Sequence, residues 1–211
     1  MVVFDFDGVL HDSRERACRC YQEARREMEL WALPDLAGSG DLPVVYQGVL
    51  GASLIRWIAF ETAERFWKRH AELTDRAAAE EPHGVIPDLV APLAELSAGP
   101  GYAVVTGSHR STVRALLARD LPTGAMPRVL LSRDDEGSKT EKLRFLHARH
   151  GARAYVGDTG SDVRHAHNAG VTAIAVAYGY PNLEDLSAAE PDQLLATPAA
   201  LAAWCRAPAR R

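Results

Sequence analysis

Two aspartates, Asp5 and Asp7, stand one residue apart at the end of an apolar run that begins at Val2. Successive side chains of an extended strand point to opposite faces, so both carboxylates lie on the same face. Like charges this close repel, and the repulsion raises one carboxyl pKa unless a cation lies beside them. A hard, oxygen-ligated ion such as Mg²⁺ removes that repulsion. The pair therefore indicates a metal site, although a solvated strand end has the same pattern.

Polar residues also follow the next apolar runs. Thr106, Gly107 and Ser108 come directly after residues 102–105 and precede a helical pattern. A turn of this kind presents backbone N–H groups and the positive end of a helix dipole to an anion. Taken alone, a hydroxyl and glycine turn is an ordinary loop.

A lysine and two more carboxylates complete the set. Lys139 follows the run 129–131 after a turn, and Asp158 and Asp162 flank the glycine-bearing loop after residues 154–156. Individually these residues fit a surface lysine, a turn and a helix cap. Together with the aspartate pair and the hydroxyl turn they place a cation site beside an anion site. Phosphoryl transfer requires that combination.

The elements that must position these residues are strands alternating with helices. We expect strands at 2–6, 102–105, 129–131, 154–156 and 171–176, and helices at 89–98, 111–118, 142–150 and 162–169. This alternation predicts an α/β fold with a doubly wound parallel sheet. Ligands of such sheets bind beyond the carboxyl ends of the strands, where all the polar residues above fall.

A second, all-helical unit interrupts this pattern after the first strand. Residues 14–33 and 53–79 have amphipathic helical patterns, and residues 34–51 between them are rich in glycine and predict a loop. We therefore expect a core domain at 1–13 and 83–211, and a helical cap domain at 14–82 that covers the carboxylates. The alanine- and arginine-rich residues 199–211 are expected to fray.

Composition narrows the class of protein. The chain has 211 residues, of which 47% are hydrophobic and 25% charged, as in soluble globular proteins. The formal net charge of -4 provides no basic surface for nucleic acid. No window is apolar enough to span a membrane, and no secretory signal precedes the first strand. We expect a cytoplasmic protein without nucleic-acid or membrane partners, and the composition fits a monomer or a homodimer.

Four motifs in this order resemble those of the haloacid dehalogenase-like (HAD) hydrolase superfamily, in the branch whose helical cap follows the first strand. The motifs are residues 4–13, residues 104–108, Lys139 and residues 157–162. Residues 162–180 further resemble the phosphoglycolate-phosphatase-like group. The resemblance implies a Rossmann-like core with an inserted cap, and a magnesium-dependent phosphoric monoester hydrolase as the activity.

The resemblance also implies roles. Asp5 would be the nucleophile that forms an aspartyl-phosphate, and Asp7 the general acid and then the general base. Asp5, the backbone carbonyl of Asp7, and Asp158 would hold Mg²⁺, with Asp162 close by or acting through water. Lys139 would neutralise the nucleophile and the transferred group.

Substrate contacts follow from the same resemblance. Thr106 and the N–H of Gly107 would bind phosphoryl oxygens, and Gly8 and Ser108 would contact the substrate. Asp7 favours a phosphate ester over a carbon–halide bond, because displacing a halide needs no proton for the leaving group. The expected substrate is a small phosphorylated metabolite, of the phosphoglycolate or sugar-phosphate class.

Several alternatives stay open. Lys142 competes with Lys139 as the motif lysine, because the proline that often follows that lysine is replaced by Thr140. In the cap, residues 48–53 and Arg56 are the candidates to reach the substrate, and His11 either lines the entrance or is exposed.

Other activities also fit the fold. A phosphomutase of the β-phosphoglucomutase type shares the Asp-x-Asp start and would protect its aspartyl-phosphate from water. A phosphonate hydrolase would need a Schiff-base lysine in the cap, where Lys68 is the only lysine. A binding module on the same fold is the non-enzymatic alternative.

Overall fold

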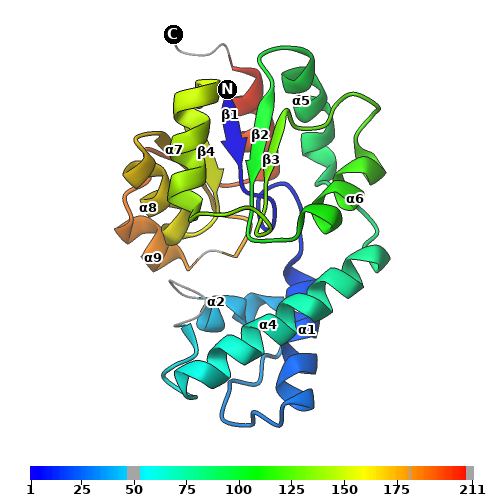
Figure 1. Ribbon diagram of the computed structural model, residues 1–211, viewed down its shortest axis with the longest axis vertical. Helices are drawn as coiled ribbons and strands as arrows, with labels where there is room; N and C mark the ends of the chain where they lie inside the picture. The colour runs from blue at the N-terminus through cyan, green and yellow to red at the C-terminus, as the bar shows by residue number, and fades with distance from the viewer. Residues whose placement is uncertain (47–52, 181, 208–211) are drawn as a thin grey trace.

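The computed structural model describes residues 1–46, 53–180 and 182–207, and its centre is a six-stranded sheet (Figure 1). The strand order is β3-β2-β1-β4-β5-β6, and every neighbouring pair is parallel. The strands are β1 (Val2–Phe4), β2 (Tyr102–Val105), β3 (Val129–Leu131), β4 (Ala154–Gly157), β5 (Thr172–Val176) and β6 (Gln193–Leu195). The α/β parallel-sheet prediction is confirmed.

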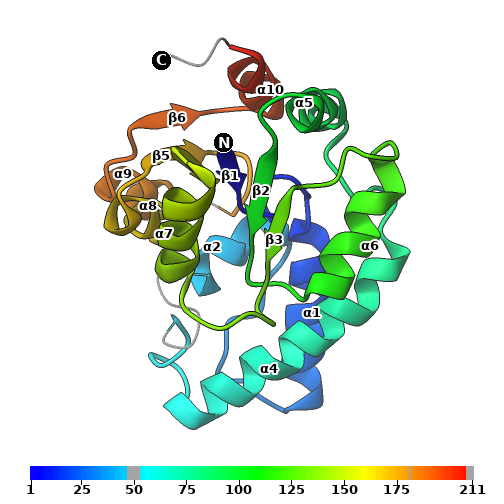
Figure 2. The ribbon, with the colours of Figure 1, turned by 45° about the horizontal axis from the view of Figure 1, so that its top comes forward.

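Helices cover both faces of this sheet (Figure 2). They are α5 (Pro87–Ala98), α6 (Arg110–Asp120) and α10 (Pro198–Arg206) on one face, and α7 (Lys139–His150), α8 (Gly160–Ala169) and α9 (Leu183–Ala188) on the other. Alternate strand residues point to opposite faces, so Phe4 packs with the first group and Val3 with the second. Two apolar layers therefore hold the strand ends in place.

Below the sheet in Figure 1 lie the helices α1 (Arg14–Glu27), α2 (Leu42–Val45) and α4 (Phe60–Ala77). Short 3₁₀ turns cover Ser39–Asp41 and Ala78–Glu80. These helices have their own apolar cluster, in which Tyr21, Leu42 and Phe66 are fully buried. Tyr180, from the segment after β5, belongs to the same cluster. The exact domain boundaries at 13/14 and 82/83 stay a prediction.

Three local expectations were wrong. The first strand ends at Phe4, because the Phe6 carbonyl accepts the N–H groups of Leu10 and His11 and turns the chain. The loop expected at 34–51 contains the turn Ser39–Asp41 and the helix α2, whose first residue, Leu42, is buried. Of the tail expected to fray, residues 199–206 belong to α10, because Thr197 caps this helix and Leu201 is fully buried against α5 and the sheet, and residues 208–211 lie outside the described residues.

Two other helices begin earlier than their apolar patterns suggested, because side chains cap them. Ser138 accepts the N–H of Glu141 and starts α7 at Lys139, and Thr159 accepts the N–H of Asp162 and starts α8 at Gly160.

Within the described residues, no helix combines the length and the apolar character needed to cross a membrane.

Candidate active site

The sheet register brings the first and fourth strand ends together. Phe4 pairs with Val156, and the N–H of Asp5 donates to the Val156 carbonyl at 2.8 Å. The residues that follow these two strands are therefore neighbours at the carboxyl edge of the sheet, where Asp5 and Asp158 lie.

Three carboxylates meet at this edge. One oxygen from each of Asp5, Asp158 and Asp162 lies within 4.8 Å of the others, and all three residues are buried. Burial raises the pKa of Asp5 to about 7, with Lys139 opposing the shift and Asp162 adding to it. Burial, and then the charges of Asp162 and Asp5, raise the pKa of Asp158 well above its ordinary value.

This cluster fits a divalent cation. The only cation bonded to it among the described residues is Lys139, so three buried carboxylates face a single positive charge. Oxygen donors at this density are the ligands of Mg²⁺, and a bound cation would favour the ionised form of each carboxyl. The excess negative charge is the physical reason why this cluster could hold a metal ion.

Lys139 joins two of the three carboxylates. Its ammonium lies 2.9 Å from Asp5 Oδ2 and 2.7 Å from Asp162 Oδ1. Burial would lower the pKa of Lys139, but Asp162 and Asp5 outweigh it and raise that pKa. The competing Lys142 is buried and donates instead to the Ser132 carbonyl at 2.7 Å. The structure therefore brings Lys139, rather than Lys142, to Asp5.

Asp158 is enclosed by backbone. The Tyr180 N–H donates to its Oδ2 at 2.7 Å, and a Cβ on Gly8 or Gly179 would lie 2.2 or 2.3 Å from that oxygen. Gly8 also has a φ of +77°, which residues with a Cβ rarely adopt. Gly8 thus makes room for Asp158, while its expected substrate contact stays a prediction.

Asp162 is held in place by its helix. Thr159 donates to Asp162 Oδ2 from its hydroxyl at 2.6 Å and from its backbone N–H at 3.1 Å. The Tyr155 hydroxyl donates to Asp162 Oδ1 at 3.1 Å. Burial would raise the pKa of Asp162, but Lys139 and the Thr159 bonds lower it.

Asp7 lies apart from the three carboxylates and has different partners. Arg16 donates to its Oδ1 at 3.0 Å and the Ser108 hydroxyl to its Oδ2 at 2.6 Å. Burial would raise the pKa of Asp7, but Arg16, His11 and the Ser108 bond together lower it. Any metal contact of Asp7 is thus left to its backbone carbonyl.

The hydroxyl turn after β2 opens onto a pocket. Thr106 is buried and accepts the Ser108 N–H at 3.0 Å, whereas Gly107 is exposed. A pocket of about 340 Å³ is lined by Thr106, Gly107, Lys139, Lys142, Arg133 and Asp135, among others. Positive groups outnumber the single carboxylate in that set, as expected of a site for an anion.

The side chains of the remaining predicted residues have partners outside the cluster of three carboxylates. Arg56 is exposed, with its guanidinium 3.8 Å from the Trp57 ring centroid and a hydrogen bond to the Val44 carbonyl. Residues 48–52 of the expected substrate loop lie outside the described residues. His11 is buried and stacks on Phe6 with ring centroids 5.3 Å apart, so the alternative of an exposed histidine was wrong.

Sequence reasoning missed Arg16 and Tyr180. Arg16 lies on the same buried face of α1 as Cys20, Tyr21 and Ala24, so an arginine on the apolar face of an amphipathic helix was the available signal. Tyr180 had no comparable signal, because its contacts come from segments far away in the sequence.

A family model described as haloacid dehalogenase-like hydrolase matches residues 2–176. A haloacid dehalogenase-like family hydrolase from Streptococcus pneumoniae has a similar structure, with a TM-score of 0.76, 17% identity and 96% of each chain covered. A predicted phosphoglycolate phosphatase from Haemophilus somnus has a TM-score of 0.74 and 19% identity, with 95% of each chain covered. A mutant of CbbY from Rhodobacter sphaeroides, in complex with xylulose-(1,5)bisphosphate, has a TM-score of 0.68 and 20% identity, with 94% of each chain covered. No curated protein matches this chain in sequence.

Proposed function

Because the chain belongs to the haloacid dehalogenase-like hydrolase family, we propose that it is a magnesium-dependent phosphatase that acts on a small phosphorylated metabolite through an aspartyl-phosphate. The observation that carries this proposal is the buried cluster of Asp5, Asp158 and Asp162, joined by Lys139, with Asp7 held separately beside it. One carboxylate can then attack while another moves protons.

Asp5 is the nucleophile of the proposed reaction. One of its carboxylate oxygens forms a bond to phosphorus while the ester bond between phosphorus and the alcohol oxygen breaks. Asp5, Asp158, Asp162 and the Asp7 carbonyl would hold Mg²⁺, which when bound neutralises the carboxylates and polarises the phosphoryl group. Lys139 adds a positive charge beside the attacking oxygen.

Asp7 moves the protons. It gives a proton to the departing alcohol, then takes one from the water that attacks phosphorus and releases phosphate from Asp5. Arg16 keeps Asp7 ionised in the free protein. The negative charge of a bound phosphate ester raises the pKa of Asp7 and favours the protonated form that the first step needs.

The Thr106 hydroxyl and the Gly107 N–H are the donors proposed for the phosphoryl oxygens. Donors fixed where charge develops stabilise the transition state more than mobile water does. The pocket beside them supports a small, anionic substrate. The predicted phosphoglycolate phosphatase and the complex of CbbY with xylulose-(1,5)bisphosphate support the same substrate class.

Phosphate release tests the proposal. The purified protein should release phosphate from 2-phosphoglycolate or p-nitrophenyl phosphate with Mg²⁺, and stop after EDTA treatment. Asp5→Asn should lose at least about 10³-fold in kcat, because a neutral amide is a much weaker nucleophile than a carboxylate. Asp88→Asn, which changes an exposed carboxylate on α5, is the matched control and should keep full activity. Equal turnover by Asp5→Asn and wild type would refute the mechanism.

A further inference from the structure

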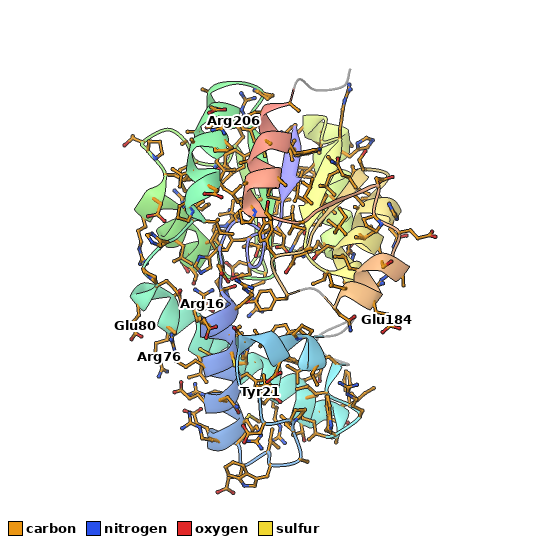
Figure 3. All side chains as sticks on the ribbon, turned by 180° about the vertical axis from the view of Figure 1, so that it is seen from behind. Arg16, Tyr21, Arg76, Glu80, Glu184 and Arg206 are labelled. Atoms are coloured by element: carbon orange, nitrogen blue, oxygen red, sulfur yellow. The ribbon has the colours of Figure 1, made fainter. Side chains whose placement is uncertain are left out.

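Arg16, on the first helix of the cap, is a buried guanidinium with too few partners. Figure 3 labels it at the end of α1 that meets the core. Only 4% of the side chain is exposed, and its one hydrogen bond among the described residues goes from Nη2 to Asp7 Oδ1. Its Nε and Nη1 are buried and have no hydrogen-bond partner among those residues.

This situation is unusual for an arginine. A guanidinium has five N–H donors, and buried donors without acceptors destabilise a folded protein. Arg69, on α4, shows the ordinary arrangement, with both oxygens of Glu27 and one of Glu72 accepting its N–H groups. The described residues therefore leave two nitrogens of Arg16 without an acceptor, which a bound ligand could supply.

Among the described residues, Asp7 is the only carboxylate that forms an ion pair with Arg16. Burial lowers the pKa of His11 and of His70 to about 4, and the charge of Arg16 contributes to both shifts. Both imidazoles are therefore neutral near pH 7. The Asp7 carboxylate shares its charge between Arg16 and the Ser108 hydroxyl. The Nε and Nη1 donors of Arg16 therefore stay without an acceptor among the described residues.

The position of Arg16 indicates which part of the substrate would carry the acceptor. Under the proposed function, on which this inference rests, Asp7 gives its proton to the leaving oxygen of the substrate. A group 3.0 Å from Asp7 then lies within a few atoms of that oxygen, on the side of the alcohol rather than of the phosphoryl group.

We infer that Arg16 binds a second anionic group of the substrate, a carboxylate or a second phosphate, carried a few atoms from the ester oxygen. Carboxylates and phosphates match the planar fork of a guanidinium. Arg56, the arginine that the sequence suggested for this role, is exposed and already paired within the cap. Arg16 is accordingly the residue that selects metabolites with a second anionic group over simple phosphate esters.

Matched substrates isolate this contribution. Ethyl phosphate and 2-phosphoglycolate differ only in a methyl group against a carboxylate, and ethylene glycol bisphosphate supplies a second phosphate instead. We expect wild type to prefer the substrates with a second anion. In Arg16→Gln the ratio of kcat/KM for 2-phosphoglycolate to that for ethyl phosphate should fall about 10- to 100-fold, the loss expected for one charged hydrogen bond.

The ratio separates this role from a structural one. Losing the Asp7 ion pair, or part of the folded population, changes kcat/KM for both substrates by the same factor. The ratio of the two kcat/KM values then stays unchanged. Arg16→Lys keeps the charge without the fork and should give an intermediate ratio. Arg19→Gln removes an exposed arginine of the same helix and should leave the wild-type ratio. Ethylene glycol bisphosphate shows whether a second phosphate is preferred to a carboxylate. A fall in kcat/KM relative to ethyl phosphate, for either 2-phosphoglycolate or the bisphosphate, supports the inference.

Two results would overturn the inference: an unchanged ratio in Arg16→Gln, or a wild-type preference for ethyl phosphate. If wild type hydrolyses none of these esters, nor p-nitrophenyl phosphate, the proposed function fails instead. Calorimetric titration with 2-phosphoglycolate then tests Arg16 directly, since binding should weaken about 10- to 100-fold in Arg16→Gln and stay the same in Arg19→Gln. Equal binding by wild type and Arg16→Gln would contradict the inference.

Discussion

Identical residue types in this site have different properties because their neighbours differ. Asp162 accepts bonds from Lys139 and Thr159, which lower its pKa, whereas burial beside two carboxylates raises the pKa of Asp158. Asp7 has an arginine partner and lies apart from both. A nucleophile, a proton carrier and metal ligands can therefore be built from one side chain type.

At the same scale, His70 should make stability depend on pH. Burial lowers its pKa to about 4, whereas an unfolded histidine titrates near 6.5. Unfolding takes up a proton between these values, so stability falls as the pH drops from about 6.5 to 4, by about 3 kcal/mol in total. His70→Gln should flatten this slope by about one proton in urea unfolding followed across that pH range.

The control for this prediction is His150→Gln, which changes an exposed histidine at the end of α7 and should keep the wild-type slope. His11 has the same lowered pKa, so part of the slope should persist in His70→Gln. A His70→Gln slope identical to that of wild type would show that His70 is already protonated in the folded cap.

At the scale of elements, the start of α8 links helix stability to the proposed metal site. Thr159 caps the helix, and the carboxylate that completes the capping box belongs to Asp162. Thr159→Ala should cost about 1 kcal/mol of unfolding free energy. It should also raise the Mg²⁺ concentration needed for half-maximal activity several-fold, because residues that orient metal ligands affect affinity.

Thr197→Ala is the matched control for this prediction. Thr197 caps α10 by accepting the Ala200 N–H at 3.1 Å, on the face of the sheet covered by α5. The control should lose similar stability in urea and keep the wild-type Mg²⁺ requirement. If both variants need the same Mg²⁺ concentration, the cap of α8 has no part in metal binding.

At the scale of the whole molecule, the acidic cluster should make the stability of the protein depend on metal. Mg²⁺ that binds only the folded chain at 100 times its dissociation constant adds about 2.7 kcal/mol, or about 5 to 10 °C in Tm. Asp158→Asn should lose most of this increase. Without metal it should melt above wild type, because one repelling carboxylate is gone.

Thermal melts with EDTA and with Mg²⁺ measure both effects, and Asp88→Asn should respond as wild type does. An equal rise in Tm for Asp158→Asn and wild type would place the ion elsewhere.

Contacts of Tyr180 join the core to the cap. Its hydroxyl forms a hydrogen bond with the Ser13 hydroxyl at 2.6 Å, and its ring stacks on Tyr46 with ring centroids 5.3 Å apart.

Much of the core and the central cluster could be predicted from the sequence. Alternating strand and helix patterns predict a parallel sheet, and a parallel sheet brings every strand's carboxyl end to one edge. Asp5, Asp158, Asp162 and Lys139 therefore had to converge, and the structure brings them together. Helix starts shifted by two or three residues, because capping depends on single hydrogen bonds rather than on periodicity.

By itself the sequence determined the α/β class, the helical insertion after the first strand and the acidic edge of the sheet, because local periodicity and chain order are enough for these. The tertiary structure alone decided that Arg16 reaches Asp7, that Tyr180 joins the cap cluster and that residues Pro198–Arg206 form a helix. The physical reason is that each of these depends on packing between segments that local patterns do not connect.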